Sequence, residues 1–344
     1  MSRTLKVCLL AASCTGATVS LPAVAQTVSE EIVVTARKRE ESVQDVPIAI
    51  SVIGAQQIKD MKLANVDDIA GILPNVVNSG GGQGGDTFAI RGLSTTSNNP
   101  GFETGIGMYI DEVYIGRQFA FVTPIFDLQR IEVLRGPQGT LFGRNTIGGA
   151  ISLTTLAPSD TFEASAQVSA GEYDLIEGGF RLSGPIGGNG FRASLSAQIR
   201  ERDGFLKDFA TGADYNGQSS LNTRASFVFE PSETVRIRAA VDYYEDDNAD
   251  SMMDIRGGAL AAADPYPVSK RRIGTNFKSF GSRESLGGMV RVDADLGWTN
   301  LVSISALRRH ETRGLLDQDF SVADISFTGR TEKQEQFSQE IRLQ

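Results

Sequence analysis

Two glycine-rich stretches are the first places where this sequence could hold a ligand with its backbone. Gly80–Gly85, "GGGQGG", satisfies the G-x-G-x-x-G pattern of dinucleotide-binding loops, which lie between a strand and the start of a helix. Here the strand-like "DTFAIRG" follows the glycines instead of preceding them. In the second stretch, Gly136 and Gly143 are seven positions apart, and Arg144-Asn145 stands where a phosphate loop has lysine and a hydroxyl residue. Neither stretch is predicted to bind a nucleotide, and no cofactor is expected.

The residue types that catalysis or metal binding requires are sparse. The single histidine, His310, has no cysteine or carboxylate cluster around it in "SALRRHETRG", so a transition-metal site is not predicted. The G-x-S-x-G nucleophile motif does not occur. Asp67-Asp68 is interpreted as negative charge at a helix N-terminus, and Asp254 with "DDNAD" as a solvated loop rather than a calcium site. We expect no catalytic residue, no metal and no enzymatic activity.

The first 25 residues have the composition of a secretory signal peptide. Arg3 and Lys6 precede an apolar stretch that ends in the A-x-A pattern Ala23-Val24-Ala25. This stretch is too short and too polar for a transmembrane anchor, and lipidation at Cys14 is the less favoured alternative. Because Cys8 and Cys14 are the only cysteines, the mature chain is expected to have no disulfide and no cysteine chemistry.

The net charge of the chain argues against one class of partner, nucleic acid. The formal net charge is −9, and it becomes more negative once the two basic residues of the signal peptide are removed. Such a chain is a poor nucleic-acid binder, because neutralisation of phosphates drives that affinity. Nucleic acid is therefore not expected as a partner.

The chain changes its pattern near residue 160. From residue 26 onward it is predicted to form a small mixed α/β unit, with two short helices in 55–76 and strands in 47–54, 86–93, 105–116, 126–139 and 148–155. The apolar run Ile32 to Val34 is expected to be extended and exposed. Beyond about Thr161, segments of roughly ten residues alternate between apolar and polar positions, as in "FRASLSAQIR" from Phe191 to Arg200.

The alternating half could be a soluble sandwich or a membrane barrel. One face of its strands is rich in charge, serine and glutamine, and the other is apolar with aromatic residues near its ends. Short turns such as "SGPIGGNG" alternate with long polar stretches. These features favour an antiparallel outer-membrane β-barrel, with short turns on the periplasmic side and long loops outside.

The two halves together resemble a TonB-dependent outer-membrane receptor. "EEIVVTARKREESVQDVPIAISVI" resembles the energy-coupling box and the start of the plug, and "FAIRGLS", "YIDEVYIG" and "FDLQRIEVLRGPQGTLFGRNTIGGAISLTT" resemble successive plug motifs. The resemblance implies a mixed α/β plug domain inside a barrel of about 22 strands. It divides the chain into a signal peptide at 1–25, a TonB box and linker at 26–43, a plug at 44–157 and a partial β-barrel at 158–344.

The resemblance also assigns residues to roles. The implied TonB box is Glu31, Ile32, Val33, Val34, Thr35 and Ala36. TonB would add to this extended segment by main-chain pairing. The implied contacts between plug and barrel are Arg91, Arg135 and Arg144. The implied ligand-binding residues, on loops that face outward, are Gln83, Asn98, Asn99, Phe102, Arg117, Gln118 and Phe119.

The expected function is active uptake of a scarce ligand across the outer membrane of a Gram-negative cell. The expected partners are TonB with its inner-membrane energising complex, outer-membrane lipid, and a small molecule such as an iron–siderophore or a sugar. About eight strand-like segments follow residue 160, and the last stops mid-strand, so we expect a fragment of a full receptor. The alternatives are a truncated product that does not transport and a ligand-binding or signalling receptor module.

Overall fold

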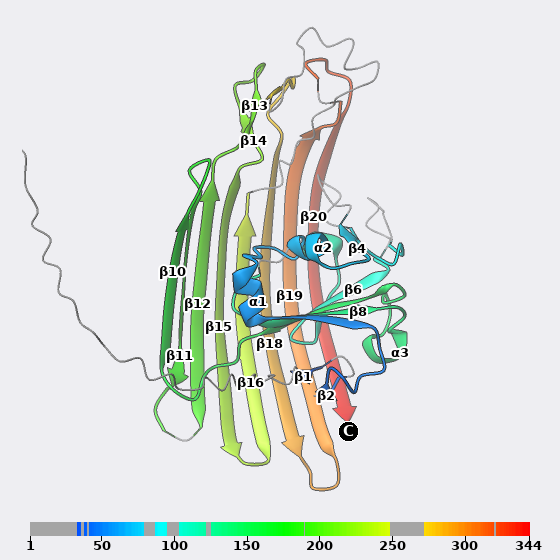
Figure 1. Ribbon diagram of the computed structural model, residues 1–344, viewed down its shortest axis with the longest axis vertical. Coiled ribbons are helices and arrows are strands. Elements are labelled where there is room, and N and C mark those ends of the chain that lie inside the picture. The colour runs from blue at the N-terminus through cyan, green and yellow to red at the C-terminus, as the bar shows by residue number, and fades with distance from the viewer. Residues whose placement is uncertain are drawn as a thin grey trace, which may run out of the picture.

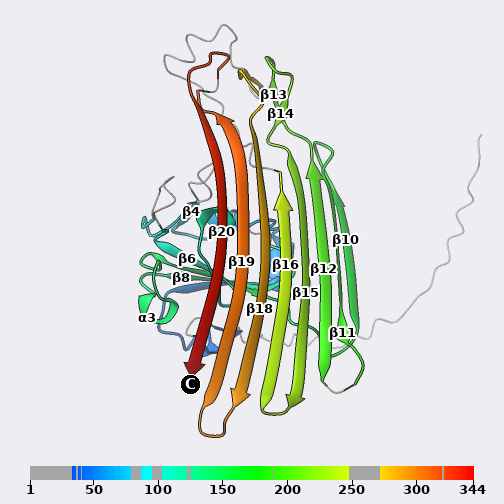
Figure 2. The same ribbon diagram turned by 180° about the vertical axis from the view of Figure 1, so that it is seen from behind.

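The computed structural model describes residues 33–35, 38–39, 41–78, 87–94, 103–121, 125–188, 190–247, 272–319 and 321–344. The described residues form a small α/β unit that lies against one face of a tall, curved β-sheet (Figures 1 and 2). We call the small unit the plug and the tall sheet the wall. The predicted signal peptide lies outside the described residues.

The plug is built on a five-stranded mixed sheet. Its strand order is β3-β8-β9-β6-β7, formed by β3 (Ile50–Gly54), β8 (Leu128–Arg135), β9 (Gly149–Thr155), β6 (Ile106–Ile110) and β7 (Val113–Ile115). β6 and β9 are parallel, and the other pairs are antiparallel. Because β6 and β9 lie inside the sheet and are covered, every residue of β6 and all but one residue of β9 are buried.

Short elements cover this sheet. They are the helices α1 (Ala55–Asp60), α2 (Asp68–Ile72) and α3 (Gly139–Phe142), the 3-10 helix η2 (Gln118–Phe121) and the two-stranded sheet β4 (Val76–Asn78) with β5 (Phe88–Ile90). The two helices predicted in 55–76 are present. One apolar core joins the helices α1 and α2 to the sheet, and Ile69, Ile90, Ile131 and Ile151 are fully buried in it.

The wall is an antiparallel sheet of eight strands in the order β10-β11-β12-β15-β16-β18-β19-β20. The strands are β10 (Glu163–Ala170), β11 (Ile176–Pro185), β12 (Phe191–Arg202), β15 (Gln218–Ser232), β16 (Val235–Asp246), β18 (Phe280–Asp295), β19 (Asn300–Asp317) and β20 (Phe327–Leu343). The eight strands match the expected number. A small sheet of β13 (Leu206–Asp208), β14 (Asp214–Tyr215) and β17 (Arg272–Ile273) stands at the end with the longer connections.

The wall places its apolar side chains outward. Val168, Leu307 and Phe337 are 82%, 64% and 68% exposed, whereas Arg224 and Arg308 on the opposite face are buried against the plug. A sheet in water would bury the apolar face and expose the charged one. The observed arrangement is that of a sheet whose outer face meets lipid and whose inner face meets a polar interior.

The described part of the chain includes no helix long and apolar enough to cross a membrane.

Gly149 is a position in the plug where no larger residue fits. Its φ is +149°, and a Cβ atom built there would lie 2.2 Å from the backbone oxygen of Leu134 on the neighbouring strand. Gly149→Ala is therefore expected to lower the free energy of unfolding of the plug by at least about 1–3 kcal/mol, the cost of a strained backbone, with the steric clash in addition. Protease resistance of the purified protein measures the effect. Gly139→Ala, at a site with open space around it, is the control and should behave as wild type.

Candidate functional site

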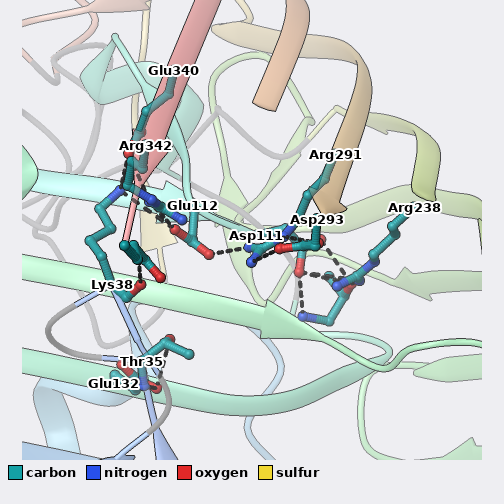
Figure 3. A network of polar contacts seen from close by, with 12 residues as sticks. Thr35, Lys38, Asp111, Glu112, Glu132, Arg238, Arg291, Asp293, Glu340 and Arg342 are labelled. Carbon is teal, nitrogen blue, oxygen red and sulfur yellow. Dashed lines mark hydrogen bonds and ion pairs between the residues drawn. The ribbon is translucent and has the colours of Figure 1, made fainter. Parts of the chain in front are cut away.

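The plug meets the wall at a two-residue turn between β6 and β7. Ile110 and Val113 are paired across the hairpin, so Asp111 and Glu112 form the turn, with φ values of 47° and 68°. Two positive φ values match the twist of a tight hairpin, but Asn-Gly or Asp-Gly is the usual choice there. The turn instead presents two carboxylates to the wall (Figure 3).

Asp111 is held by two wall arginines and by the last strand of the plug sheet. Its carboxylate accepts hydrogen bonds from Arg224 Nη2 at 2.6 Å and from Arg238 Nη2 at 3.3 Å. Thr155 donates its backbone N–H at 3.0 Å and its hydroxyl at 2.8 Å. Burial alone would raise the pKa of Asp111, but the charges of Arg238 and Arg224 and the bonds from Thr155 outweigh it and lower the pKa to about 2.

Glu112 makes a second set of contacts on neighbouring strands. It accepts a hydrogen bond from Arg342 Nη1 of β20 at 2.6 Å and pairs with Arg291 of β18. The ammonium group of Lys38 lies 3.8 Å from the same carboxylate. Burial opposes the charged form, yet these cations, Arg291 first, lower the pKa of Glu112. The turn thus connects the plug to β15, β16, β18 and β20.

Two further contacts fix other edges of the plug. Asp127 lies 2.8 Å from Arg181 Nε of β11 and accepts a hydrogen bond from Ser196 of β12 at 3.0 Å. Burial raises the pKa of Asp127 in spite of Arg181. Arg117, just after β7, pairs with Glu332 of β20 at 2.9 Å.

The N-terminal segment is docked on the plug. Val33–Val34 forms β1, which pairs antiparallel with β2 (Glu41–Ser42). Val34 is fully buried in a cluster with Val46, Tyr109 and Leu134. For the described part of the run Ile32 to Val34, the expected extended conformation is confirmed at Val33–Val34, but the expected exposure is wrong at Val34, because this apolar cluster of the plug covers its side chain.

The buried carboxylate of Glu132 binds the same N-terminal segment. Glu132 Oε1 accepts the backbone N–H of Thr35 at 2.9 Å and Nε of Arg130 at 2.7 Å, and Arg130 Nη2 also reaches the Thr35 hydroxyl at 3.1 Å. Figure 3 shows Thr35 beside Glu132, below the Asp111–Glu112 turn. These bonds engage main-chain and side-chain groups that would otherwise be free to pair with another protein.

Lys38 joins this segment to the wall. Its ammonium group lies 3.4 Å from Glu340 of β20 and over the rings of Phe142 and Tyr109, at 5.1 and 5.5 Å from their centroids. The Lys38 side chain is 6% exposed. Burial raises the pKa of Tyr109, which keeps its hydroxyl neutral as a donor to the Phe142 carbonyl at 2.6 Å.

The three arginines predicted to contact the barrel make no contact with the described wall strands that the structure records. Arg135 donates to Ser51 at 2.6 Å and Arg144 lies 3.5 Å from Glu103, so both have partners within the plug, and Arg91 is exposed. In Figures 1 and 2 the α3 end of the plug, which Arg144 follows, extends beyond β20, where no described strand faces it. Contacts of these three arginines with a barrel stay a prediction.

Several predicted binding residues cannot be placed. Outside the described residues lie Glu31, Ile32, Ala36, Gln83, Asn98, Asn99 and Phe102, and the same holds for the side chains of Gln118 and Phe119. Arg117 is described, and it lines a cavity between plug and wall.

Sequence reasoning missed Asp111, Glu112 and Lys38. The signal that could have found the first two is the acidic pair that interrupts the apolar run "GIGMYIDEVYIG". A charged pair inside a run of buried residues has to be a turn or has to be paired, and here it is both.

Comparison with known proteins identifies the plug. The model of the TonB-dependent receptor plug domain matches residues 42–150. The pesticin receptor of Yersinia pestis is 31% identical over 232 residues, which cover 64% of this chain and 32% of the relative. The vitamin B12 transporter BtuB of Vibrio vulnificus is 28% identical over 220 residues, which cover 63% of this chain and 35% of that protein. The chain thus spans about a third of the length of these relatives.

Solved structures share the arrangement of plug and wall. The ferric yersiniabactin uptake receptor FyuA from Yersinia pestis superposes with a TM-score of 0.71 at 20% identity, over 86% of this chain and 45% of that one. The pyoverdine outer-membrane receptor FpvA from Pseudomonas aeruginosa gives a TM-score of 0.74 at 15% identity, over 90% of this chain and 45% of that one. The likeness shows a common fold. With the plug match, it shows that residues 42–150 are a TonB-dependent receptor plug domain, and that the eight strands of the wall have the fold of the barrel strands in outer-membrane receptors.

Proposed function

We propose that the receptor takes up a scarce ligand, an iron–siderophore or another polar nutrient, across the outer membrane, and that TonB opens the plug by pulling residues 31–36. The main observation in support of this proposal is the conformation of Val33–Thr35. Val33–Val34 is already a strand, which is the conformation that main-chain pairing with a partner requires, and a small number of contacts, including the bond from Thr35 to Glu132, keep the segment on the plug.

The position of the segment supports the same reading. β1 lies at the end of the wall where short turns join β15 to β16 and β18 to β19 (Figure 1). Short turns belong on the periplasmic side of outer-membrane barrels. A periplasmic partner would therefore reach Val33–Thr35 without crossing the membrane.

The names of relatives and the lining of one cavity support the proposed ligand class. Relatives carry the names of receptors for pesticin, vitamin B12 and ferrioxamine. The cavity on the side of the long loops combines Arg117, His310 and Tyr244 with apolar plug residues. This mixture suits a polar organic ligand with hydrogen-bonding groups and some apolar surface.

Val33→Pro tests the proposal. Proline removes the backbone N–H and fixes φ, so it prevents the pairing of an added strand at this point. We expect TonB-dependent uptake to fall to the level of cells without TonB. The assay measures cell-associated radiolabel from a panel of ferric siderophores, cobalamin and sugars, with the receptor expressed at its full natural length in cells lacking their own copy.

Val33→Ile is the matched control, since it keeps the β-branched side chain and the backbone donor. Uptake should be retained in that variant. Equal uptake by wild type and Val33→Pro would show that residues 31–36 are not the coupling segment. A wild-type receptor that takes up none of the panel in a TonB-dependent way would leave the transport proposal without support.

A further inference from the structure

We infer that the ligand passes between plug and wall at the β6–β7 turn, along the inner face of β15–β19, with Asp111, Glu112 and Val113 as the barrier that moves. This inference rests on the proposed function and specifies its route. Two cavities on the same inner face, one above and one below this turn, carry the argument.

The upper cavity lies on the side of the long loops. It has a volume of about 70 Å³. Its wall residues come from the loop-side halves of the strands, and they include Asn222, Arg224, Asp242, Arg308 and His310. Gly287 makes room for this lining, because a Cβ atom there would lie 2.6 Å from Asp242 Oδ2 and 2.8 Å from Arg308 Nη1.

The lower cavity lies on the side of the short turns. It has a volume of about 1180 Å³, and Glu230, Arg236, Arg291 and Asp293 of the wall line it together with Thr35 of the N-terminal segment. It is already large enough for a small organic ligand. Polar side chains of both signs line the two cavities, so the route suits a hydrated polar molecule.

The barrier between the cavities is thin. Asp111 and Arg238 line the lower cavity, Arg224 lines the upper one, and Thr155 lines both. The ion pairs of Asp111 with the two arginines therefore stand at the boundary. Beside them, Val113 is the one plug residue in a buried apolar cluster whose wall members are small or slender: Ala240, Met289, Val302, Ile304 and Ala306.

Moving the barrier also breaks fewer contacts than moving the whole plug. β7 is an edge strand of three residues, paired on one side with β6. Displacing the turn and β7 breaks that short pairing and the ion pairs of Asp111 and Glu112. It also takes Ile115 out of the main apolar core and breaks the bond from Gln336 of β20 to the Tyr114 carbonyl, but it leaves the central pairs β8–β9 and β6–β9 and the other members of that core in place. Removal of the whole plug would additionally break the Asp127–Arg181 pair at the other edge.

Reversible cross-links distinguish the local route from removal of the whole plug. One receptor carries Asp111→Cys with Arg224→Cys, and the control carries Asp127→Cys with Arg181→Cys. Both pairs replace a plug carboxylate and its wall arginine, but Asp127 and Arg181 line neither cavity. Because Cys8 and Cys14 lie in the predicted signal peptide, the added cysteines would be the only thiols within residues 26–344.

Each pair is bridged on cells with a short bis-maleimide that contains a reducible bond. Uptake of the labelled ligand found for wild type is then measured before bridging, after bridging and after reduction. We expect the bridge at 111–224 to reduce uptake to the TonB-independent background, and reduction to restore it. The bridge at 127–181 should leave uptake at the level of its own unbridged receptor.

Loss of uptake with both bridges would overturn the local route, because it would show that the whole plug has to separate from the wall. Full uptake with the 111–224 bridge, whatever the control does, would also overturn it. Recovery on reduction shows that a bridged receptor was folded. Failure of the transport proposal itself is seen separately, as absence of TonB-dependent uptake by wild type.

Discussion

Asp111→Asn is expected to loosen the plug in the wall more than any other single change of a polar residue at this interface. Removing one partner of a buried ion pair costs about 3–5 kcal/mol, because the remaining charges stay buried without compensation. Here Arg238, with a side chain 15% exposed, would lose the carboxylate that it pairs with, and Arg224, at 8%, would keep only Asp242 at 3.2 Å, so the lower end of that range is expected. Entry of a bulky antibiotic into cells without TonB, and the melting temperature of the purified receptor, measure the effect.

The pH dependence of this effect has a definite sign. The pKa of Asp111 falls from 3.8 to about 2 in the folded receptor. The stability that its charge contributes is therefore present above 3.8 and is lost as the pH falls through about 2. The difference between wild type and Asp111→Asn should stay constant from neutral pH down to mildly acidic pH.

Glu103→Gln is the control for Asp111→Asn. Glu103 pairs with Arg144 at the plug surface, where the arginine side chain is 76% exposed. Such pairs contribute about 0–1 kcal/mol. If both variants admit the antibiotic equally, or if neither changes the melting temperature, the Asp111 cluster does not seat the plug.

Lys38→Met is expected to release the N-terminal segment from the plug in the absence of TonB. The Lys38 ammonium is desolvated between two aromatic rings and two carboxylates, and a cation–π contact in such a site contributes about 2 kcal/mol. That loss corresponds to a rise of about thirtyfold in the released population. The measurement is the rate at which Val33→Cys reacts with a membrane-impermeant thiol reagent in isolated outer membranes.

Arg39→Met is the neighbouring comparison, since the Arg39 side chain is 57% exposed and pairs with Glu41 of β2. It should leave the labelling rate close to that of the parent. Equal rates in the Lys38→Met and Arg39→Met receptors would mean that the pairing of β1 with β2 and the Glu132 bonds suffice to hold the segment.

The wall could be predicted from sequence because its signal is local. From Phe191 to Arg200 every second residue is apolar, and this period of two fixes which side chains share a face. Local patterns also predicted the two short plug helices, which the structure places at Ala55–Asp60 and Asp68–Ile72.

The contacts between plug and wall were beyond local reasoning. Asp111 meets Arg224, 113 positions along the chain, and Glu112 meets Arg342, 230 positions along. No spacing rule connects residues that far apart, since their meeting depends on how the plug sits against the sheet. Burial of Val34 has the same origin, because its cover comes from Tyr109 and Leu134 of the plug sheet.

The conformation of the Asp111–Glu112 turn also bears on the mechanical work of opening. Neither residue is glycine, and a left-handed backbone costs an ordinary residue about 1–2 kcal/mol. The pairing of Ile110 with Val113 imposes that conformation, and the wall arginines add to it by binding the two carboxylates. Once the ion pairs and the β6–β7 pairing break, the backbone can relax, and the energy recovered offsets part of the work done on the N-terminal segment. The ion pairs of Asp111 and Glu112 therefore keep the plug closed against thermal fluctuation, and relief of the backbone strain favours completion of the movement once these pairs are broken.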